Sequence, residues 1–458
     1  MEQVHGITPH IFREYDIRGV VDKDLTEEAV CQIGKAFGTI VKGQGGSVIT
    51  SGRDGRLHSK RLQEALIAGL VSTGIKVIDI GQCPTPVLYF SIFHLDTDGG
   101  IQITGSHNPP QFNGLKMCLG PSTIHGQQIQ EIKRLIENGE FEQGNGLCEK
   151  HEIIGDYLKY LSENININRP LKVVLDCGNG VSALVAPDAF RQAGCIVESL
   201  FCQVDGTFPN HHPDPTVLEN LKDLKKRVKD TGADIGIAFD GDGDRIGVVD
   251  ENANVIYGDK ILLLLARRLL RDNPGAAIIG EVKCSHILYE DIKAHGGRPI
   301  MWKTGHSLIK QKMKDSGALL AGEMSGHIFF ADRFFGFDDA TYAALRLCEL
   351  LAEENKSLSM LLHGLAETVS TPEIRMDCSE EHKFVLVDKV KESLKADGYD
   401  VIDVDGARVV FDDGWGLIRA SNTQPVIVLR FEANTPDRLK EIRNLIEGRL
   451  EEVKKALG

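Results

Sequence analysis

Residues 240–245 read Asp-Gly-Asp-Gly-Asp-Arg, so three carboxylates alternate with two glycines. They follow the apolar run Ile235–Phe239, which predicts a buried strand with the acids on the loop at its end. Glycine lets such a loop bend until the acidic side chains face one point. Unpaired carboxylates repel each other there, and a hard divalent cation such as Mg2+ takes oxygen ligands. The carboxylates of Asp240, Asp242 and Asp244 therefore form a candidate magnesium site.

Two other interpretations of this loop stay open at this point. An Asp/Gly cluster is often a solvated turn. A calcium-binding helix-loop-helix hand carries acids at the same first positions, and Glu251 falls at its twelfth. Its sixth position requires glycine, however, and here carries Arg245, while Ile246–Asp250 reads as a strand where the hand needs a helix. Arg245 instead suggests an anion on the far side of the metal.

The composition is that of an ordinary globular protein of 458 residues, with 42% hydrophobic and 26% charged residues. The net charge of −14 argues against nucleic acid as a partner, because phosphate backbones require concentrated Lys and Arg. The ten cysteines form no Cys-x-x-Cys pair, which favours buried thiols in a reducing cytoplasm. Met1–His10 lacks an apolar signal core, and the apolar run Ile261–Ala266 is too short to span a membrane.

Three stretches of the chain share one plan. Each opens with an apolar strand that ends in a polar turn: Ser47–Arg56, Val173–Gly180 and Ala277–Ser285. A helical segment follows and stops at glycine: Gly74, Gly194 and Gly296–Gly297. A second strand comes next: Ile75–Ile80, Ile196–Phe201 and Pro299–Trp302. Later in each unit another strand runs into a chemically rich loop: Thr104–Pro109, Asp240–Arg245 and Glu323–His327.

The segments between these strands are amphipathic. Leucines recur every four residues at Leu62, Leu66 and Leu70, and a three-to-four spacing links Leu218 with Val228. Strands alternating with such helices predict mixed α/β layers, and ligands bind beyond strand ends in such sheets. Three similar units that each present one loop therefore predict a shared central cleft.

After residue 367 the plan changes to a helix at Val385–Ala396, then three short strands, then a final helix at Pro436–Leu457. The strands are expected at Val409–Asp412, Gly416–Ala420 and Val426–Ala433. This predicts an α+β domain of a different type. We therefore expect three similar α/β domains at residues 1–151, 152–254 and 255–366, followed by a C-terminal α+β domain at 367–458.

Ser106 lies in the first of the chemically rich loops, directly after the strand expected at Gly100–Ile103. A serine in a turn is structural more often than catalytic, and no Gly-x-Ser-x-Gly elbow is present. In the repeated plan, however, the loop of Ser106 corresponds to the loop of the three aspartates. His107 and Lys116 also follow Ser106 closely in the sequence. One hypothesis is that it carries a phosphoryl group, whose roughly −1.5 to −2 charge would complete the oxygen shell of the cation.

Other polar loops offer groups that recognise a sugar phosphate, although each alone also fits an ordinary turn. A carboxylate such as Glu323 can accept bonds from two adjacent sugar hydroxyls, with Ser325 and His327 beside it. The segment Arg419–Pro425 gathers an arginine with hydroxyls and an amide, a set suited to phosphate. A polar turn at Tyr15–Gly19 contains a further arginine. The remaining candidates for contact with substrate are Tyr15, Arg18, Lys283 and His306.

Four motifs occur in order along nearly the whole chain: Thr-Gly-Ser-His-Asn-Pro, Asp-Gly-Asp-Gly-Asp-Arg, Gly-Glu-Met-Ser-Gly-His and Arg-Ala-Ser-Asn-Thr-x-Pro, after Tyr-Asp-Ile-Arg-Gly near the start. In this combination the chain resembles the α-D-phosphohexomutase superfamily, and within it the bacterial phosphomannomutase/phosphoglucomutases. No motif position departs from the pattern. The resemblance implies four domains around one cleft, with a TATA-box-binding-protein-like fold in the last.

The resemblance also implies roles for individual residues. Ser106 is expected to be phosphorylated and to bind one Mg2+ per chain together with the three aspartates. The loop at Glu323–His327 is expected to contact the sugar, and the loop at Arg419–Thr423 the phosphate that the substrate already carries. The expected catalytic residues are Ser106, His107, Lys116, Arg18 and Arg245. The expected substrate-binding residues are Tyr15, Lys283, His306, Glu323, Ser325, His327, Arg419, Ser421, Asn422 and Thr423.

The activity implied is reversible phosphoryl transfer between the C1 and C6 hydroxyls of mannose and glucose phosphates. A hexose 1,6-bisphosphate is the implied intermediate, with glucose 1,6-bisphosphate as activator. We expect no nucleic acid or membrane partner and a monomer, with a homodimer as the alternative. The rival interpretations are a phosphoglucosamine mutase, which usually carries Gln where this chain has Met324, a simple magnesium-dependent phosphatase, and a non-catalytic calcium-binding protein.

Overall fold

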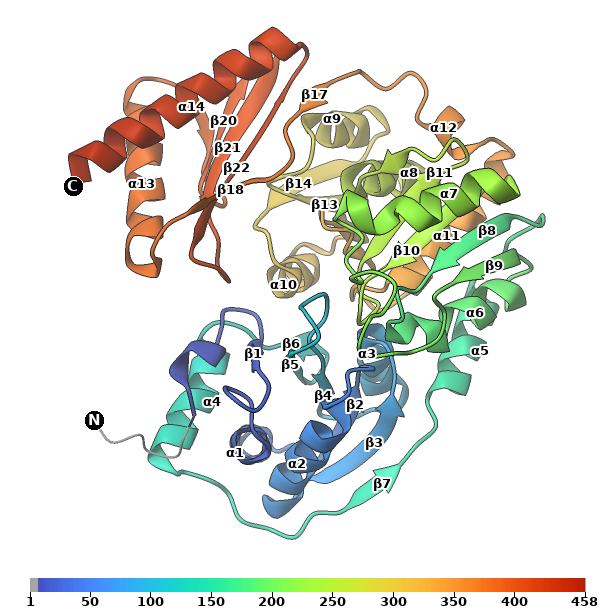
Figure 1. Cartoon of the computed structure of the whole chain (residues 1–458), viewed down its shortest axis with the longest axis vertical. Coiled ribbons are helices and arrows are strands. Elements are labelled where there is room, and N and C mark those ends of the chain that lie inside the picture. Colours follow the sequence, from blue (N-terminus) through green and yellow to red (C-terminus); the bar gives the residue numbers. More distant parts are fainter. Residues whose placement is uncertain (1–6, 458) are drawn as a thin grey trace.

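The structure is a computed structural model that describes residues 7–457. The first six residues of the predicted first domain, with most of the segment tested for a signal, and Gly458 of the predicted fourth domain lie outside that range. Four β-sheets follow one another along the chain, each flanked by helices. Figure 1 shows the four parts arranged along an arc, with the C-terminal part across from the N-terminal part.

The first sheet has the order β1-β5-β4-β2-β3-β7, with β6 beside β5. Its strands are β1 (Ile17–Val20), β2 (Val48–Arg53), β3 (Lys76–Gln82), β4 (Gly99–Ile103), β5 (Phe112–Leu119), β6 (Ser122–Thr123) and β7 (Cys148–Lys150). Its helices are α1 (Glu27–Gly43), α2 (Ser59–Ser72), α3 (Thr85–His94) and α4 (Gln127–Asn138). The turn predicted at Tyr15–Gly19 is wrong in its second half, because Ile17–Val20 pairs with β5 as an edge strand.

The second and third sheets repeat the central part of the first. The second has the order β12-β11-β10-β8-β9 and the third β14-β13-β15-β16. The strands of the second are β8 (Lys172–Asp176), β9 (Ile196–Leu200), β10 (Ile235–Phe239), β11 (Ile246–Asp250) and β12 (Val255–Ile256). Those of the third are β13 (Ala277–Glu281), β14 (Arg298–Trp302), β15 (Leu320–Gly322) and β16 (Ile328–Phe330).

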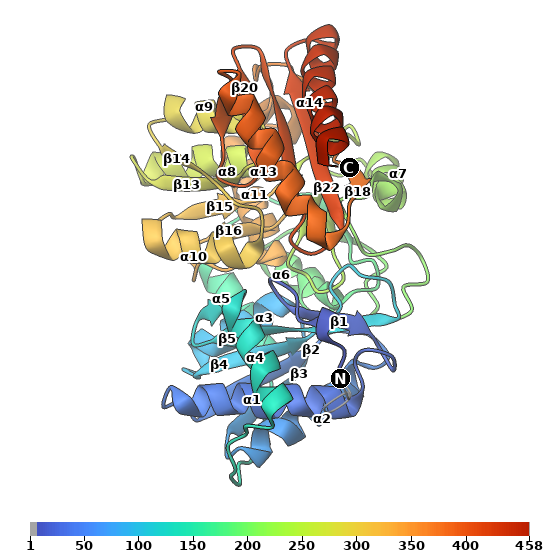
Figure 2. The same ribbon diagram turned by 90° about the vertical axis from the view of Figure 1, so that its left-hand side faces the viewer.

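In each of the three sheets the first strand of the unit pairs in parallel with the second and the third, and a fourth strand pairs antiparallel with the third. The plan predicted from the sequence is thus confirmed. Each chemically rich loop connects the third strand to the fourth, so all three occupy the same place in their sheets. Figure 2 shows the first sheet at one end of the molecule and the third beyond it, with α10 (His306–Ser316) facing the first.

The helices that cover these sheets bury the expected faces, with one exception. Leu62, Leu66 and Leu70 of α2 are each buried, as their spacing predicts. Leu218 is 53% exposed, because residues 218–221 form a 3-10 turn and α7 begins only at Lys222. The tighter turn has three residues per turn and therefore places Leu218 off the buried stripe. The remaining helices of this part are α5 (Ile154–Asn164), α6 (Ala186–Gln192), α7 (Lys222–Thr231), α8 (Gly258–Asp272), α9 (His286–Ala294), α11 (Ala340–Glu354) and α12 (Leu358–Leu361).

The C-terminal part is an antiparallel sheet with two helices packed on it. Its order is β17-β22-β21-β20-β19, with β18 also beside β22. The elements are β17 (Val369–Ser370), β18 (Ile374–Asp377), α13 (Glu380–Ala396), β19 (Asp400–Ile402), β20 (Ala407–Phe411), β21 (Gly414–Ala420), β22 (Val426–Ala433) and α14 (Pro436–Leu457). The predicted α+β class is confirmed, and three short outer strands, β17 to β19, are additions to the prediction.

Candidate active site

Ser106 lies on the turn between β4 and β5, and only 2% of its surface is exposed. Its φ of +48° places it in the left-handed region, which is uncommon for a residue with a side chain. Thr104 supports this conformation, since its Oγ1 accepts a hydrogen bond of 2.8 Å from the Ser106 amide. The hydroxyl Oγ lies 3.2 Å from Nδ1 of His107 and 3.1 Å from Oδ2 of Asp240. The turn thus points the hydroxyl at the predicted metal loop.

The buried guanidinium of Arg56 holds this turn from behind. It donates to the carbonyl oxygens of Ser106 at 2.8 Å and Asn108 at 2.6 Å, and to two further carbonyls of the same loop. Asp54 accepts from the Arg56 Nε at 3.1 Å and from the Gly105 amide at 3.0 Å. Neither residue was predicted as part of the site. The polar end of the segment Ser47–Arg56 was the only sequence signal for them.

The second domain also presses on the serine turn. A Cβ at Gly241 would lie 2.4 Å from the Ser106 carbonyl oxygen, so only glycine fits. The His212 imidazole contacts the His107 carbonyl oxygen through Nε2, and the Phe208 ring covers the Arg56 guanidinium, whose Cζ is 5.2 Å from the ring centre. The serine turn is therefore fixed by two domains at once.

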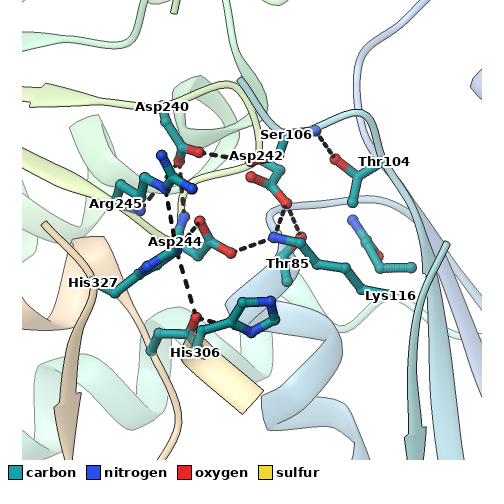
Figure 3. A network of polar contacts seen from close by, with 12 residues as sticks. Thr85, Thr104, Ser106, Lys116, Asp240, Asp242, Asp244, Arg245, His306 and His327 are labelled. Carbon is teal, nitrogen blue, oxygen red and sulfur yellow. Dashed lines mark hydrogen bonds and ion pairs between the residues drawn. The ribbon is translucent and has the colours of Figure 1, made fainter. Parts of the chain in front are cut away.

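The three aspartates of residues 240–245 converge, as the alternating pattern predicts (Figure 3). All are fully buried, and one oxygen of each lies within 4.8 Å of one oxygen of the other two. Asp240 organises the loop, because its Oδ1 accepts from the amides of Gly243, Asp244 and Arg245 at 3.0–3.1 Å. Burial, with Asp244 and Asp242 alongside, raises the pKa of Asp240 well above its usual value. The exposed-turn interpretation is thus wrong.

Lys116 is the cation within this cluster in the structure. Its buried Nζ donates to Asp242 Oδ2 at 2.8 Å and also to Asp244 Oδ2. Thr85 adds a hydrogen bond of 2.6 Å to the same Asp242 oxygen. Burial acts to raise the pKa of Asp242, and Lys116 outweighs it, so that pKa lies below its usual value. Lys116 therefore belongs to the charge balance of the three aspartates (Figure 3).

The cluster also fits a divalent cation. Asp242 Oδ1 is buried without a hydrogen-bond partner among residues 7–457, which marks an oxygen that still needs a positive or donating neighbour. The available donors are carboxylate and hydroxyl oxygens, the ligands that Mg2+ takes. The donor set and the orphaned oxygen therefore agree with a magnesium ion at this loop.

His327 joins the metal loop to the loop at Glu323–His327. Its Nδ1 lies 2.6 Å from Glu323 Oε2, and its Nε2 lies 3.2 Å from both Asp244 Oδ1 and Arg245 Nε. Burial acts to lower the pKa of His327, but Asp244 outweighs it and Glu323 adds to the effect, raising that pKa to about 9. With Nδ1 donating to Glu323, Nε2 can donate to Asp244 only when the ring carries both protons, and it can accept from Arg245 only when the ring is neutral.

The remainder of that loop is internally bonded. Glu323 Oε1 accepts from the Gly305 amide at 2.7 Å, and Oε2 accepts from Ser325 Oγ at 3.1 Å. Glu281, which the sequence did not single out, is fully buried and accepts from the Met324 amide at 2.9 Å. Lys283 Nζ lies 3.4 Å from Glu281 Oε1 and 3.2 Å from Glu373 Oε2. Glu281 therefore links the loop at Glu323–His327 to Lys283.

Tyr15 connects three domains. Its hydroxyl donates to the Thr304 carbonyl at 3.0 Å and accepts from Asn422 Nδ2 at 2.5 Å. Arg419 Nε donates at 2.9 Å to Asp405 Oδ2, the oxygen that also accepts from the Thr304 amide at 3.1 Å. The predicted phosphate loop of the C-terminal domain thus meets residues of the first and third domains.

The other predicted residues differ from one another in their hydrogen bonds, pKa shifts and exposure. Arg18 donates to Asp16 Oδ2 and Asn108 Oδ1 at 2.5 Å each, and its buried Nε has no partner in the described chain. Burial lowers the pKa values of His107 and His306 well below the usual value. Ser421 Oγ accepts from the amides of Thr423 and Gln424 at 3.3 and 3.2 Å. Thr423 is exposed.

Models of known protein families match nearly the whole chain. Residues 9–143, 155–254 and 257–369 match the phosphoglucomutase/phosphomannomutase alpha/beta/alpha domains I, II and III, and residues 373–448 match the C-terminal domain of the same proteins. The chain belongs to the phosphoglucomutase/phosphomannomutase family. It is accordingly an isomerase, and the prediction made from the four motifs is confirmed.

Individual members of the family are similar over their full length. The chain is 47% identical to a phosphomannomutase/phosphoglucomutase of Pseudomonas aeruginosa, over 98% of this chain and 96% of that one. It is 45% identical to a phosphoglucomutase of Neisseria meningitidis, over 97% and 98%. A crystal structure of a phosphoglucomutase/phosphomannomutase family protein from Burkholderia thailandensis superposes with a TM-score of 0.93 at 45% identity, covering 98% of both chains.

A helix that crosses a membrane must be about 20 residues long and predominantly apolar. None within residues 7–457 combines the length and apolar character needed to cross one.

Proposed function

We propose that this protein moves a phosphoryl group reversibly between the C1 and C6 oxygens of hexose phosphates, with Ser106 as the carrier and a hexose 1,6-bisphosphate as the intermediate. The observation that carries the proposal is the 3.1 Å contact between Ser106 Oγ and Asp240 Oδ2. It brings a hydroxyl nucleophile to a buried cluster of carboxylates that suits a metal. A phosphatase would need no further phosphate loop, whereas the groups at Arg419–Thr423 are suited to bind a second phosphate.

Asp240, Asp242 and Asp244, with an oxygen of phosphorylated Ser106, would hold one Mg2+. The ion supplies positive charge that stabilises the transferring phosphoryl group. Lys116 and Arg245 supply further positive charge from the protein. Asp242 holds Lys116 and His327 contacts Arg245 before substrate arrives, so the positions of both side chains cost little reorganisation during the reaction.

In the forward step the bond between Ser106 Oγ and phosphorus breaks, and a bond forms between phosphorus and the free C1 or C6 oxygen of the sugar phosphate. The proton of that sugar hydroxyl leaves to a protein base. After the bisphosphate turns over, its other phosphoryl group returns to Ser106. His107 and His327 fit opposite proton roles: burial keeps the pKa of His107 low, so its ring is neutral, whereas Asp244 keeps His327 protonated. Arg18 and His306 are the remaining candidates.

The sugar and its distal phosphate would be held by the other three domains. Glu323 and Ser325 would accept and donate hydrogen bonds at O3 and O4 of the ring and would make no contact with O2. Glucose and mannose differ only at C2, so both would fit. Arg419, Ser421, Asn422 and Thr423 would bind the distal phosphate, with Lys283, His306 and Tyr15 beside it. Asp405 already orients the Arg419 guanidinium at 2.9 Å, which supports a fixed phosphate contact at this loop.

The domain limits inferred from the sequence, residues 1–151, 152–254, 255–366 and 367–458, give each domain one loop of this site. We further infer a monomer that works in a reducing cytoplasm, with glucose 1,6-bisphosphate as activator. All ten cysteines are free in the structure, which supports a reducing compartment. A homodimer is the alternative, and sedimentation at several protein concentrations separates the two.

The deciding experiment measures turnover of glucose 1-phosphate and mannose 1-phosphate, with and without Mg2+ and glucose 1,6-bisphosphate. Activation by the bisphosphate and similar kcat/KM for both sugars are expected. A phosphoserine appears as one extra phosphate in the intact mass, and Ser106→Ala removes both the phosphate and the activity. Ser122→Ala, on the outer strand β6, is the matched control. Full activity of Ser106→Ala would contradict the carrier role, and a large preference for one sugar would contradict the dual specificity.

A further inference from the structure

Asp338 lies just beyond the sugar loop, where a backbone bridge to Phe329 fixes its position. The side chain is fully buried. Its Oδ1 accepts a hydrogen bond of 2.9 Å from Lys310 Nζ. Its Oδ2 has no hydrogen-bond partner anywhere in residues 7–457. A buried carboxylate oxygen without a partner is costly, so this atom points to a ligand that the protein is built to receive.

Two imidazole nitrogens face that oxygen. His306 Nδ1 lies 3.8 Å and His327 Nε2 lies 3.9 Å from Asp338 Oδ2. His306 Nδ1 is itself buried and unpartnered within the described chain. His327 Nε2 lies 3.2 Å from Asp244 Oδ1, so one ligand atom from each of Asp244, His327 and Asp338 falls within 4.8 Å of the others. Figure 3 shows His327 and His306 next to Asp244, one of the three aspartates.

We propose that Asp244, His327 and Asp338, with His306 as the fourth donor, bind a transition-metal cation of the zinc type. This site adjoins the magnesium site and shares Asp244 with it. Zinc is bound by nitrogen and carboxylate oxygen at about 2.0–2.2 Å in a tetrahedron, which places ligand atoms roughly 3.3–3.5 Å apart. The separations of 3.2 Å between His327 and Asp244 and 3.9 Å between His327 and Asp338 need shifts of only a few tenths of an ångström. His306 lies 3.8 Å from Asp338 but outside the group of three, so its ring must move further to become the fourth donor.

The donor set distinguishes this site from the magnesium site. Two of its four donors are imidazoles, which suit zinc, cobalt or nickel, whereas magnesium takes oxygen. Lys310 pairs with Asp338 and Lys116 pairs with Asp244, so a bound cation shares each carboxylate with a lysine ammonium.

Occupation of this site removes Asp244 Oδ1 and His327 from the mutase reaction and therefore inhibits it. Because Asp244 presents its other oxygen to Lys116 on the magnesium side, both cations can bind together. Zinc inhibition is thus expected to be noncompetitive with magnesium. Zinc that merely replaced magnesium at the three aspartates would instead compete with it.

Binding of cobalt(II) at this site can be detected directly, because a four-coordinate cobalt ion with histidine ligands absorbs visible light. The full chain is titrated with Co2+ in saturating Mg2+, and one equivalent with this spectrum is expected. Asp338→Asn is expected to lose the signal. Asp242→Asn, which alters only the magnesium cluster, is the matched control and keeps it. His306→Gln, which is expected to weaken cobalt binding, gives a second test should Asp338→Asn fail to fold.

The thiols of Cys177 and Cys202, whose sulfurs lie 3.0 Å apart, are the competing place for a soft metal. A sulfur-to-cobalt charge-transfer band would reveal binding there, and the double variant Cys177→Ser/Cys202→Ser removes it. Retention of the cobalt spectrum in Asp338→Asn, or its loss in the double serine variant, would overturn the proposal.

Inhibition gives the second measurement, and it rests on the proposed mutase activity, whereas the cobalt spectrum does not. Zinc is expected to inhibit noncompetitively with respect to Mg2+, and Asp338→Asn is expected to raise its inhibition constant at least about tenfold. Inhibition that is competitive with Mg2+ and unchanged by Asp338→Asn would contradict the site. If the cobalt spectrum is present while no mutase activity exists, the proposed function fails and the metal site stands.

Discussion

Nζ of Lys116 lies 2.8 Å from Oδ2 of Asp242. The same nitrogen contacts Asp244, so a lysine neutralises two of the three aspartates that would hold magnesium. Metal and ammonium therefore compete for the negative charge of the same carboxylates. Lys116→Met removes the competitor and leaves buried carboxylates that need a cation. We expect tighter magnesium binding by calorimetry together with a large loss of kcat, because the lysine also supplies charge to the reaction.

Lys133→Met, on the half-exposed face of α4, is the control for the loss of one positive charge. Weaker magnesium binding in Lys116→Met would show that the lysine assembles the cluster and does not compete for it.

Arg56 is expected to set the geometry of the serine turn. Its guanidinium contacts four carbonyl oxygens of the loop, and a lysine ammonium cannot reproduce that planar set of donors. Arg56→Lys should lower the free energy of unfolding by about 3–5 kcal/mol and reduce kcat more than it raises KM. Denaturation and steady-state kinetics measure the two effects. Arg53→Lys, at the end of the same strand, is the matched control, and an unchanged kcat in Arg56→Lys would contradict the positioning role.

The pH dependence of stability is expected to depend on Asp339. Burial raises its pKa from 3.8 to about 7. Between these values the folded protein keeps a proton that the unfolded chain has lost, so the free energy of unfolding falls as the pH rises. Relative to Asp339→Asn, the natural protein should lose about 2–3 kcal/mol between pH 5 and pH 8. Urea denaturation at both pH values tests this, with exposed Asp188→Asn as control; a constant difference would contradict it.

The alkaline limit of activity should move when Glu323 loses its charge. Asp244 and Glu323 together hold the pKa of His327 at about 9 against the effect of burial. Glu323→Gln removes one of these carboxylates, so the protonated ring is lost at lower pH. The alkaline limb of the kcat profile is expected to shift to lower pH. Ser325→Ala, which removes a neighbouring hydroxyl without changing charge, should leave the limb in place; an identical shift in both variants would rule out the charge effect.

Tyr15→Phe tests the junction of three domains. The ring still packs against Gly305, where a Cβ would lie 2.7 Å from Tyr15 Cζ, but the hydroxyl bonds to Thr304 and Asn422 are lost. Two neutral hydrogen bonds of about 0.5–1.5 kcal/mol each predict a fall in kcat/KM of several-fold to about a hundredfold. We expect the change mainly in KM. Tyr160→Phe, remote from the site, is the control, and an unchanged KM would show that substrate closes the site without this contact.

The parts of the site that lie on regular patterns could be predicted from the sequence. Ser106, Asp240 and Glu323 each follow a strand in a repeated unit, and alternating apolar runs locate such strands. Helix α14 was predicted to the residue for the same reason, whereas α13 begins at Glu380, five residues before the predicted start at Val385. Leu218 was placed wrongly because a 3-10 turn keeps the apolar composition of a helix while changing its period.

The supporting residues could not be predicted, because their contacts are distant in the sequence. Arg56 is 50 residues from the carbonyl of Ser106, and Glu281 is 43 residues from the amide of Met324. A single arginine or glutamate after a strand carries no pattern of its own. Asp338 shows the same limit, since only the folded chain brings it to His306. Short edge strands such as β17 have two residues and too few side chains to show alternation.

The close approach of Gly241 to the Ser106 carbonyl couples two loops that belong to different sheets. Neither loop can change its backbone path unless the other changes with it. A chimera that takes its N-terminal domain from one relative and the next domain from another therefore functions only when both parents share this junction. In recombination or domain shuffling, position 241 and residues 104–109 should be inherited together as a single unit.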